Sequence, residues 1–307
     1  MSSDSHTDHF HHVRDAIGFD LPGGAADAHG HGLLDVVLPN IGGFQLTKFM
    51  VLQVVAAVFV GIVFRGLAKR IQSGEPAKGR FWNFWESIAL FLRDEVVRPT
   101  IGDDHHDHDD DHSHGHDSNH QSHPSTGGHP ADQYLPFIWS CFFYILICNL
   151  LGAIPWLGSA TGNLNVTGVL AISAFVATVV YGFRAMGPGG FFKNMMPETG
   201  VPGAFGNGLT LGIFAIEVFG FFIKHGVLAI RLFANIMGGH TVLAVILGFI
   251  AAVAHSDSGT AMWGLVTFGS VVGQIFIGCL ELFVAFLQAY VFSFLATIFI
   301  AGAVHEH

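Results

Sequence analysis

Charged residues are scarce in this chain. Asp, Glu, Lys and Arg make up 12% of its 307 residues, whereas soluble domains carry about 25%. Hydrophobic residues account for 51%, and the mean hydropathy is +0.51. Because a bilayer core about 30 Å thick needs about 20 apolar residues per helix, this composition predicts an integral membrane protein and argues against a soluble domain.

Other features are missing too. The three cysteines, Cys141, Cys148 and Cys279, lie in apolar runs without metal-ligand spacing, so we expect no metal site from them. No stretch resembles a nucleotide-binding loop such as GxxxxGKS, and we expect no cofactor and no nucleic-acid partner. The start, MSSDSHTDHFHHVRD, lacks an apolar core behind a basic segment, which argues against a signal peptide, and its acidity argues against a mitochondrial transit peptide.

Polar residues are concentrated in two regions. Residues 1–44 form a polar N-terminal segment rich in Gly, His and Asp, and residues 45–307 are predicted to form one membrane domain. A low-complexity loop at about 99–133 interrupts this domain. Seven aspartates between Asp103 and Asp117 account for much of the net charge of −10, so that charge describes one loop more than the whole chain.

The chain is predicted to be an all-α membrane protein with five passes. The expected spans are Gln45–Leu67, Tyr134–Ile154, Val166–Phe183, Leu209–Ala254 and Ala261–Val304. The last two would each be more than about 60 Å long as helices, roughly twice the bilayer core. No strong turn signal interrupts them, so we expect two long, strongly tilted helices.

Two further regions complete the expected architecture. The segment FWNFWESIALFLRDEVVRP, with Trp82 and Trp85 at one end and charges at the other, is typical of an amphipathic helix in the membrane interface. A Gly/Pro-rich turn is expected after the third span, over 184–203.

Positive charge predicts the orientation. Nine of the thirteen Lys and Arg residues lie in 65–98 or at Arg184 and Lys193, whereas the loops 152–165 and 255–259 have none. By the positive-inside rule the basic stretches face the cytoplasm. The N-terminus is then outside and the C-terminus is cytoplasmic.

The two long segments carry polar residues at regular spacing. On the first, Glu217, Lys224 and Arg231 are seven residues apart, which keeps them near one face of a helix. An arginine in the middle of a bilayer helix costs at least about 2.5–3.5 kcal/mol on insertion scales. Asn235 shares its face, whereas His240, nine residues after Arg231, lies about 180° away.

The second long segment repeats this spacing of seven with Gln274, Glu281 and Gln288. Two facing helices would each present one polar stripe. Such residues can simply join helices by hydrogen bonds. Intramembrane ionisable groups, however, usually mark an ion path, and His and Glu can exchange protons near neutral pH when burial tunes them.

Several segments resemble one known family. RLFAN at 231–235 resembles the signature of subunit a of the F-type ATP synthases, the stator part of the membrane proton channel. Further matches follow in order along the chain, covering about 45–307 apart from the His-rich loop: FRGLAKRIQSGEPAKGRFWN at 64–83, NLNVTGVLA at 163–171, YGFRAMGPGGFFK at 181–193, and LQAYVFSFLATIFIAGAVHEH at 287–307.

The resemblance implies roles for individual residues. Arg231 matches the arginine that faces the ring of c subunits and keeps the passing ring carboxylate deprotonated, with Gln288 beside it and Asn235 one turn away. Glu217, which precedes Lys224, matches an acid of the cytoplasmic half-channel.

By the same resemblance, His240 and Glu281 would occupy two positions of the outer half-channel. Many bacterial members have the acid at the first position and the histidine at the second. Here they are exchanged, as in mitochondrial members, which suggests that the chemistry depends on the pair and not on either position alone.

The resemblance also implies a mechanism and partners. Two half-channels that do not meet would be joined by the rotating c-subunit ring, and b-type peripheral stalk subunits would connect this chain to a catalytic ATPase head. The chain itself would conduct protons without being an enzyme. The expected location is the inner (plasma) membrane of a bacterium.

A second reading is a divalent metal transporter. Nine histidines lie in residues 103–130 and six more in the first forty residues, and His-rich tracts can bind Zn, Ni or Cu. This reading expects His and carboxylate ligands together within the spans, where few histidines other than His225 and His240 occur. Arg231 would also repel a divalent cation.

Overall fold

The computed structural model describes residues 18–19, 36–37, 40–41, 44–45, 47–71, 79–102, 129–154, 158–196, 204–254 and 260–304. Two antiparallel pairs of short strands precede the helices: β1 (Gly18–Phe19) with β2 (Val36–Val37), and β3 (Asn40–Ile41) with β4 (Phe44–Gln45). The long helices are α1 (Lys48–Ile71), α4 (Leu135–Gly152), α5 (Leu164–Asn194), α6 (Ala204–Ala254) and α7 (Thr260–Val304). All five are long and apolar enough to cross a membrane.

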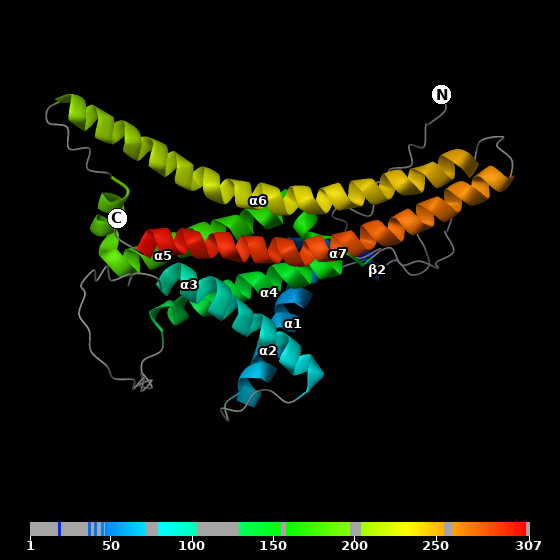
Figure 1. The fold of residues 1–307 in the computed structure, drawn as a ribbon, viewed down its shortest axis with the longest axis horizontal. Helices are drawn as coiled ribbons and strands as arrows, with labels where there is room; N and C mark the ends of the chain where they lie inside the picture. Colours follow the sequence, from blue (N-terminus) through cyan, green and yellow to red (C-terminus); the bar gives the residue numbers. More distant parts are fainter. Residues whose placement is uncertain are drawn as a thin grey trace, which may run out of the picture.

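Helices α6 and α7 dominate the molecule. They have 51 and 45 residues without a break, which corresponds to about 75 and 70 Å. Helices of this length exceed the bilayer core more than twofold, so they must lie at a steep tilt to its normal. The two helices run side by side from their connection and then separate, and α5 packs against both (Figure 1). The predicted long, continuous helices are confirmed.

The best-buried core lies where α4 packs against α7. Phe142 and Phe143 of α4 are each 1% exposed, and Phe292 of α7 is fully buried. On α7 small residues recur at helical spacing and are buried, namely Ala285, Ala289, Ala296 and Ala303. Small side chains allow two helices to approach closely, so α4 packs tightly against α7, which α5 and α6 also contact.

Helix α5 is interrupted where the sequence predicted a turn. Its helical backbone runs a few residues past the predicted end at Phe183 and breaks at Gly187, beyond which a second helical stretch continues to Asn194. Gly187 has φ 73°, a conformation that glycine adopts without a steric penalty. After the kink, Phe191 packs back onto Gly182, where an added Cβ would lie 2.6 Å from the Phe191 ring. The Gly/Pro signal therefore marks a break between two helical stretches, as the sequence predicted.

The amphipathic helix follows α1. It consists of α2 (Arg80–Phe91), a π-helical turn η1 (Leu92–Val97) and α3 (Arg98–Gly102). Its Phe81 and Phe84 side chains are more than half exposed, as expected for the membrane interface. Trp85, however, is buried against Phe59 and Phe143, so this tryptophan joins the helix to α1 and α4.

The predicted loop at 99–133 is shorter than expected at both ends. Residues up to Gly102 belong to α3, and residues from Pro130 form the short helix η2 (Pro130–Tyr134). The rest of the loop, residues 103–128, lies outside the described residues, as do 255–259 and all but the four strands of the segment 1–44. The division into an N-terminal segment and a membrane domain thus stays a prediction.

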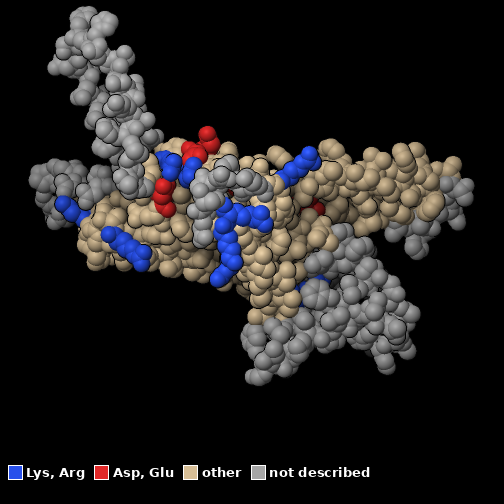
Figure 2. Space-filling model, turned by 90° about the horizontal axis from the view of Figure 1, so that it is seen from below, with Lys and Arg blue, Asp and Glu red and all other residues tan. Residues whose placement is uncertain are grey.

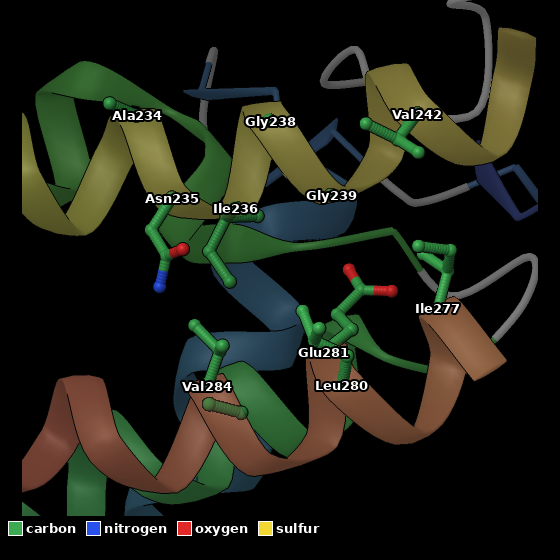
Figure 3. A pocket seen from close by; sticks show the side chains of 11 residues that line it. Ala234, Asn235, Ile236, Gly238, Gly239, Val242, Ile277, Leu280, Glu281 and Val284 are labelled. Carbon is green, nitrogen blue, oxygen red and sulfur yellow. The ribbon is translucent and has the colours of Figure 1, made fainter.

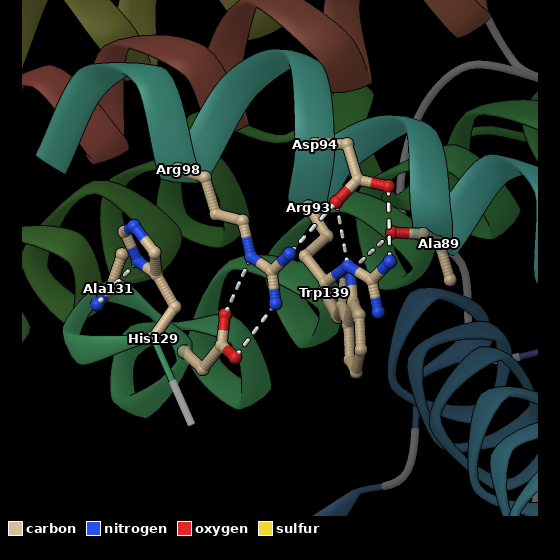
Figure 4. A network of polar contacts seen from close by, with 8 residues as sticks. Ala89, Arg93, Asp94, Arg98, His129, Ala131 and Trp139 are labelled. Carbon is tan, nitrogen blue, oxygen red and sulfur yellow. Dashed lines mark hydrogen bonds and ion pairs between the residues drawn. The ribbon is translucent and has the colours of Figure 1, made fainter. Parts of the chain in front are cut away.

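A polar cluster joins the two helices that flank this loop (Figure 4). The Arg98 guanidinium donates to both carboxylate oxygens of Asp132, Nε to Oδ1 at 3.1 Å and Nη2 to Oδ2 at 3.0 Å. Arg93 donates to Asp94, and this hydrogen bond lowers the pKa of the Asp94 carboxyl. The Trp139 indole donates to the Ala89 carbonyl at 3.0 Å. Together these contacts fix the amphipathic helix to the start of α4.

Lys and Arg side chains are unevenly distributed over the surface. Seen from below, they gather over the left and middle of the molecule, and none is visible on the right-hand end that α6 and α7 form near their connection (Figure 2). On this face the basic side chains thus lie away from the end where α6 and α7 connect.

Candidate functional site

The polar stripe of α6 faces outward. Glu217, Lys224 and Arg231 are all exposed, so the spacing of seven does place them on an open face of the helix. Lys224 Nζ lies 3.6 Å from Glu217 Oε1, with both side chains about half exposed. No hydrogen bond or ion pair joins Arg231 to any other residue that the structure describes. A permanent cation thus stands near the middle of an apolar helix without a carboxylate partner in the described part of the chain.

The polar residues of α7 are more buried than those of α6. Gln274 and Glu281 are half-buried, and Gln288 is 4% exposed. The two stripes therefore do not face each other along their whole length, as the sequence suggested. They diverge because α6 separates from α7 toward its own N-terminus (Figure 1).

The two helices contact each other around Glu281. A cavity of about 260 Å³ lies between them, and the side chains of Asn235 and Glu281 both point into it (Figure 3). Gly239 forms its α6 wall: a Cβ added there would lie 2.9 Å from Glu281 Oε1. The absence of a side chain at position 239 is therefore what lets the Glu281 carboxylate lie against α6.

The contact between Gly239 and Glu281 shows which residues of the antiparallel helices α6 and α7 lie opposite each other. A second contact, between Ile246 and Gly273, agrees with this alignment. Arg231 lies eight residues before Gly239, and Ala289 eight residues after Glu281, so Arg231 is level with Gln288 and Ala289 on α7. Contact between the Arg231 and Gln288 side chains stays a prediction. Arg231 is exposed on α6, whereas Gln288 is buried on α7.

Several buried polar atoms near this interface have no hydrogen-bond partner among the described residues. They are Nε2 of His240, Gln274 and Gln288 and the Thr267 hydroxyl. A buried donor or acceptor without a partner costs about 1–3 kcal/mol, so native proteins satisfy such groups with water or another chain. The α6–α7 interface thus requires water or further protein to complete its hydrogen bonds.

Sequence reasoning missed a buried polar group behind the cavity. Asn149, at the end of α4, donates from Nδ2 to the Ala285 carbonyl at 3.3 Å, and its Oδ1 accepts from the Thr161 hydroxyl at 2.8 Å. Ser159 contacts the Thr161 hydroxyl at 2.9 Å. All three polar side chains are at most 1% exposed. Ala285 also lines the cavity, so this network reaches the back of the Glu281 site.

The segment that carries Ser159 and Thr161 is the short helix η3 (Ala160–Gly162). It packs against α1, α4, α5 and α6. A lone asparagine in an apolar span and a Ser-Ala-Thr loop were the only signals in the sequence. Neither signal predicts the hydrogen bond from Asn149 to the Ala285 carbonyl of α7, because that contact depends on tertiary packing.

Comparison with known proteins decides between the two readings. The family model described as "ATP synthase A chain" matches residues 118–301. The chain belongs to this family. It is 32% identical to ATP synthase subunit a of Chloroherpeton thalassium over 305 residues, covering 97% of this chain and 77% of the relative. Identity to the Myxococcus xanthus subunit a is 34% over 279 residues, covering 90% and 78%.

Membership of the ATP synthase A chain family fixes the general activity. The chain is a multi-pass, proton-translocating subunit of the membrane sector of an ATP synthase and not itself a catalyst. These relatives give no support to a metal transporter. Among the described residues, no group of three or more His, Cys, Asp or Glu side chains could hold a metal ion.

Proposed function

We propose that this chain provides two offset half-channels to a rotating ring of c subunits, with Arg231 between them. The observation that carries the proposal is the position of Arg231: exposed, near the middle of α6 and without a carboxylate partner in the described part of the chain. An arginine stays protonated at any biological pH. Its charge in an apolar setting is compensated if a carboxylate of another subunit passes in front of it.

The outer half-channel in this proposal runs through the α6–α7 interface. His240, Glu281 and Asn235 line or flank the cavity, and the buried Nε2 atoms of His240 and Gln274 need partners that water can supply. Imidazole and carboxyl groups can both take and release protons. Asn149 and Thr161 lie behind the cavity and fix the α7 backbone at Ala285.

The inner half-channel runs along the exposed Glu217 and Lys224 of α6. There α6 has separated from α7, so this chain supplies only one wall and the ring supplies the other. A ring carboxylate would take a proton from the outer path, turn through lipid in neutral form and release the proton at the inner path. Arg231, with Gln288 level on α7, stabilises the charged carboxylate between the paths and blocks a direct leak.

The driving force then follows from the membrane potential. Each proton that crosses 100 mV supplies about 2.3 kcal/mol. The resulting rotation would drive ATP synthesis in a catalytic head, held to this chain by b-type peripheral stalk subunits. By the positive-inside rule, the end that carries Arg184 and Lys193 faces the cytoplasm, with the N-terminus outside, in a bacterial inner membrane.

The decisive experiment is Arg231→Ala in the whole complex. ATP synthesis in inverted membrane vesicles under an imposed proton gradient should be abolished, while passive proton leak persists or rises because nothing separates the half-channels electrostatically. Leu247→Ala, which also removes an exposed side chain of α6, is the control and should keep synthesis. Synthesis near the unmodified rate in Arg231→Ala would remove the proposed role of this arginine.

A further inference from the structure

Helix α5 carries a groove on the face that it turns away from α6 and α7. The groove has a volume of about 430 Å³ and is lined mainly by aliphatic side chains of α5, ending at Tyr181 and Arg184. Four of the aliphatic side chains are 40–66% exposed, namely Val169, Ile172, Val176 and Val180. No described part of the chain covers them.

The groove is apolar along its length. Ser173 is the only polar side chain before Tyr181, and its hydroxyl donates to the Leu170 carbonyl at 2.7 Å. This internal hydrogen bond leaves the groove no free donor at its middle. From Val169 to Arg184 the helix rises about 22 Å, which exceeds the half-thickness of about 15 Å that one leaflet contributes to the bilayer core. The groove can thus hold one acyl chain.

The groove ends at a cation that has no acid beside it. Arg184 is exposed, and no hydrogen bond or ion pair joins it to another described residue. Arg93 and Arg98, by contrast, are paired with Asp94 and Asp132. Tyr181 lies three residues before Arg184 on the same face, and its hydroxyl can donate a hydrogen bond.

We propose that this groove is a binding site for an anionic phospholipid, with an acyl chain along Val169–Val180 and the phosphate at Arg184. A guanidinium engages phosphate oxygens with two parallel N–H donors. Basic side chains at the end of membrane-spanning helices attract anionic head groups by about 1 kcal/mol each. The site is separate from the proton path, because it lies on α5 and uses none of the polar residues of α6 and α7.

The first test measures the lipids that stay with the purified complex. Native mass spectrometry of the unmodified complex should show retained phosphatidylglycerol or another anionic phospholipid in preference to phosphatidylcholine. Arg184→Gln should lower this preference about fivefold, the factor that corresponds to about 1 kcal/mol. Arg65→Gln, which removes an exposed cation of α1, should leave it unchanged. Equal retention in Arg184→Gln would overturn the proposal.

A second pair of measurements identifies the occupant directly. Val176→Trp should fill the groove and displace the lipid while Arg184 remains. This variant tests the proposal even if the complex with Arg184→Gln fails to assemble. A photo-crosslinking residue at position 176 should yield lipid adducts. Adducts with a protein subunit of the complex instead would show that a helix, and not a lipid, occupies this groove.

Discussion

The two ends of the α6–α7 pair differ in how deeply their polar side chains are buried. Between the middle of α6 and the connection the helices are in contact. Glu281 and Asn235 line the cavity between them, and Gln274 is half-buried. Toward the other end the helices have separated, and Glu217 and Lys224 lie on an open surface about half exposed. The same spacing of seven residues thus produces an interior site at one end and a surface site at the other.

This difference bears on how each half of the proposed proton path is built. In the closed end the walls come from one chain, so its geometry is set by packing within α6, α7 and the Asn149 network. In the open end our proposal requires a partner to supply the second wall. Arg231 lies at the transition, level with Gln288, where a permanent cation can act on both halves. Changes at the transition should therefore have the largest effect, and changes away from both halves the smallest.

The largest effect is expected from Arg231→Lys, which keeps the charge. ATP synthesis should still be lost almost as fully as in Arg231→Ala. A compact ammonium lacks the planar fork that can engage a carboxylate and Gln288 together, and an amine can give up its proton in a site of low polarity. The measurement is gradient-driven ATP synthesis in inverted vesicles. Synthesis above about a tenth of the unmodified rate would mean that charge alone suffices at this position.

The closed end should be sensitive to its two proton-exchanging groups. His240→Ala or Glu281→Gln should each lower synthesis by about 10²-fold, the usual effect of losing a positioned proton-transfer group. The double variant with His240→Glu and Glu281→His keeps both groups and exchanges them, so its loss should be far smaller. If the double variant is as inactive as the single ones, each position requires its own group and the pair is not interchangeable.

The lengths of the apolar runs were enough to predict the number of spans and the two long helices. Runs of about 20 or more apolar residues are too long for membrane strands, so a helix is the structure that satisfies their backbone in lipid. The Gly/Pro turn after the third span was also predictable, because Gly187 and Pro188 interrupt the helix there. The second helical stretch beyond this turn was not predicted, and its Phe191 packs back onto Gly182 of the first.

For the candidate site, spacing placed Glu217, Lys224 and Arg231 correctly on one face but did not show which neighbour that face meets. Whether a stripe is buried depends on where α6 separates from α7 and on how α5 packs against both. The Asn149 network was not predictable for a related reason. Its partners lie at positions 159, 161 and 285, and no local pattern connects residues so far apart.

The cavity wall offers a smaller perturbation of the closed end. In Gly239→Ala the new Cβ would lie 2.9 Å from Glu281 Oε1 and 3.2 Å from its Cδ, so the carboxyl group must turn away from α6. A side chain forced off its rotamer costs about 0.5–1.5 kcal/mol, and a barrier raised by this amount slows synthesis about 2- to 10-fold.

The matched control for this change is Gly248→Ala. It lies on the same helix, and an added Cβ there meets nothing within 4 Å. Both substitutions favour the helix equally, so any difference between them reports on Glu281. Equal rates in the two variants would show that the position of the Glu281 carboxylate against Gly239 is not important for proton transfer.

The smallest effect is expected from deleting residues 104–127 of the His-rich loop. Arg98 and Asp132 hold the two flanking helices together, and an added Cβ on Gly102 would lie 2.5 Å from the His129 ring. A short connection can therefore replace the loop without moving either helix. ATP-driven proton pumping in vesicles should stay nearly unchanged.

The control, Arg98→Ala, keeps the loop and removes the ion pair with Asp132. This pair is partly exposed and worth up to about 1 kcal/mol, so its loss should lower the thermal stability of the complex slightly. Loss of pumping by an assembled complex that lacks the loop would show that this segment takes part in proton transfer after all.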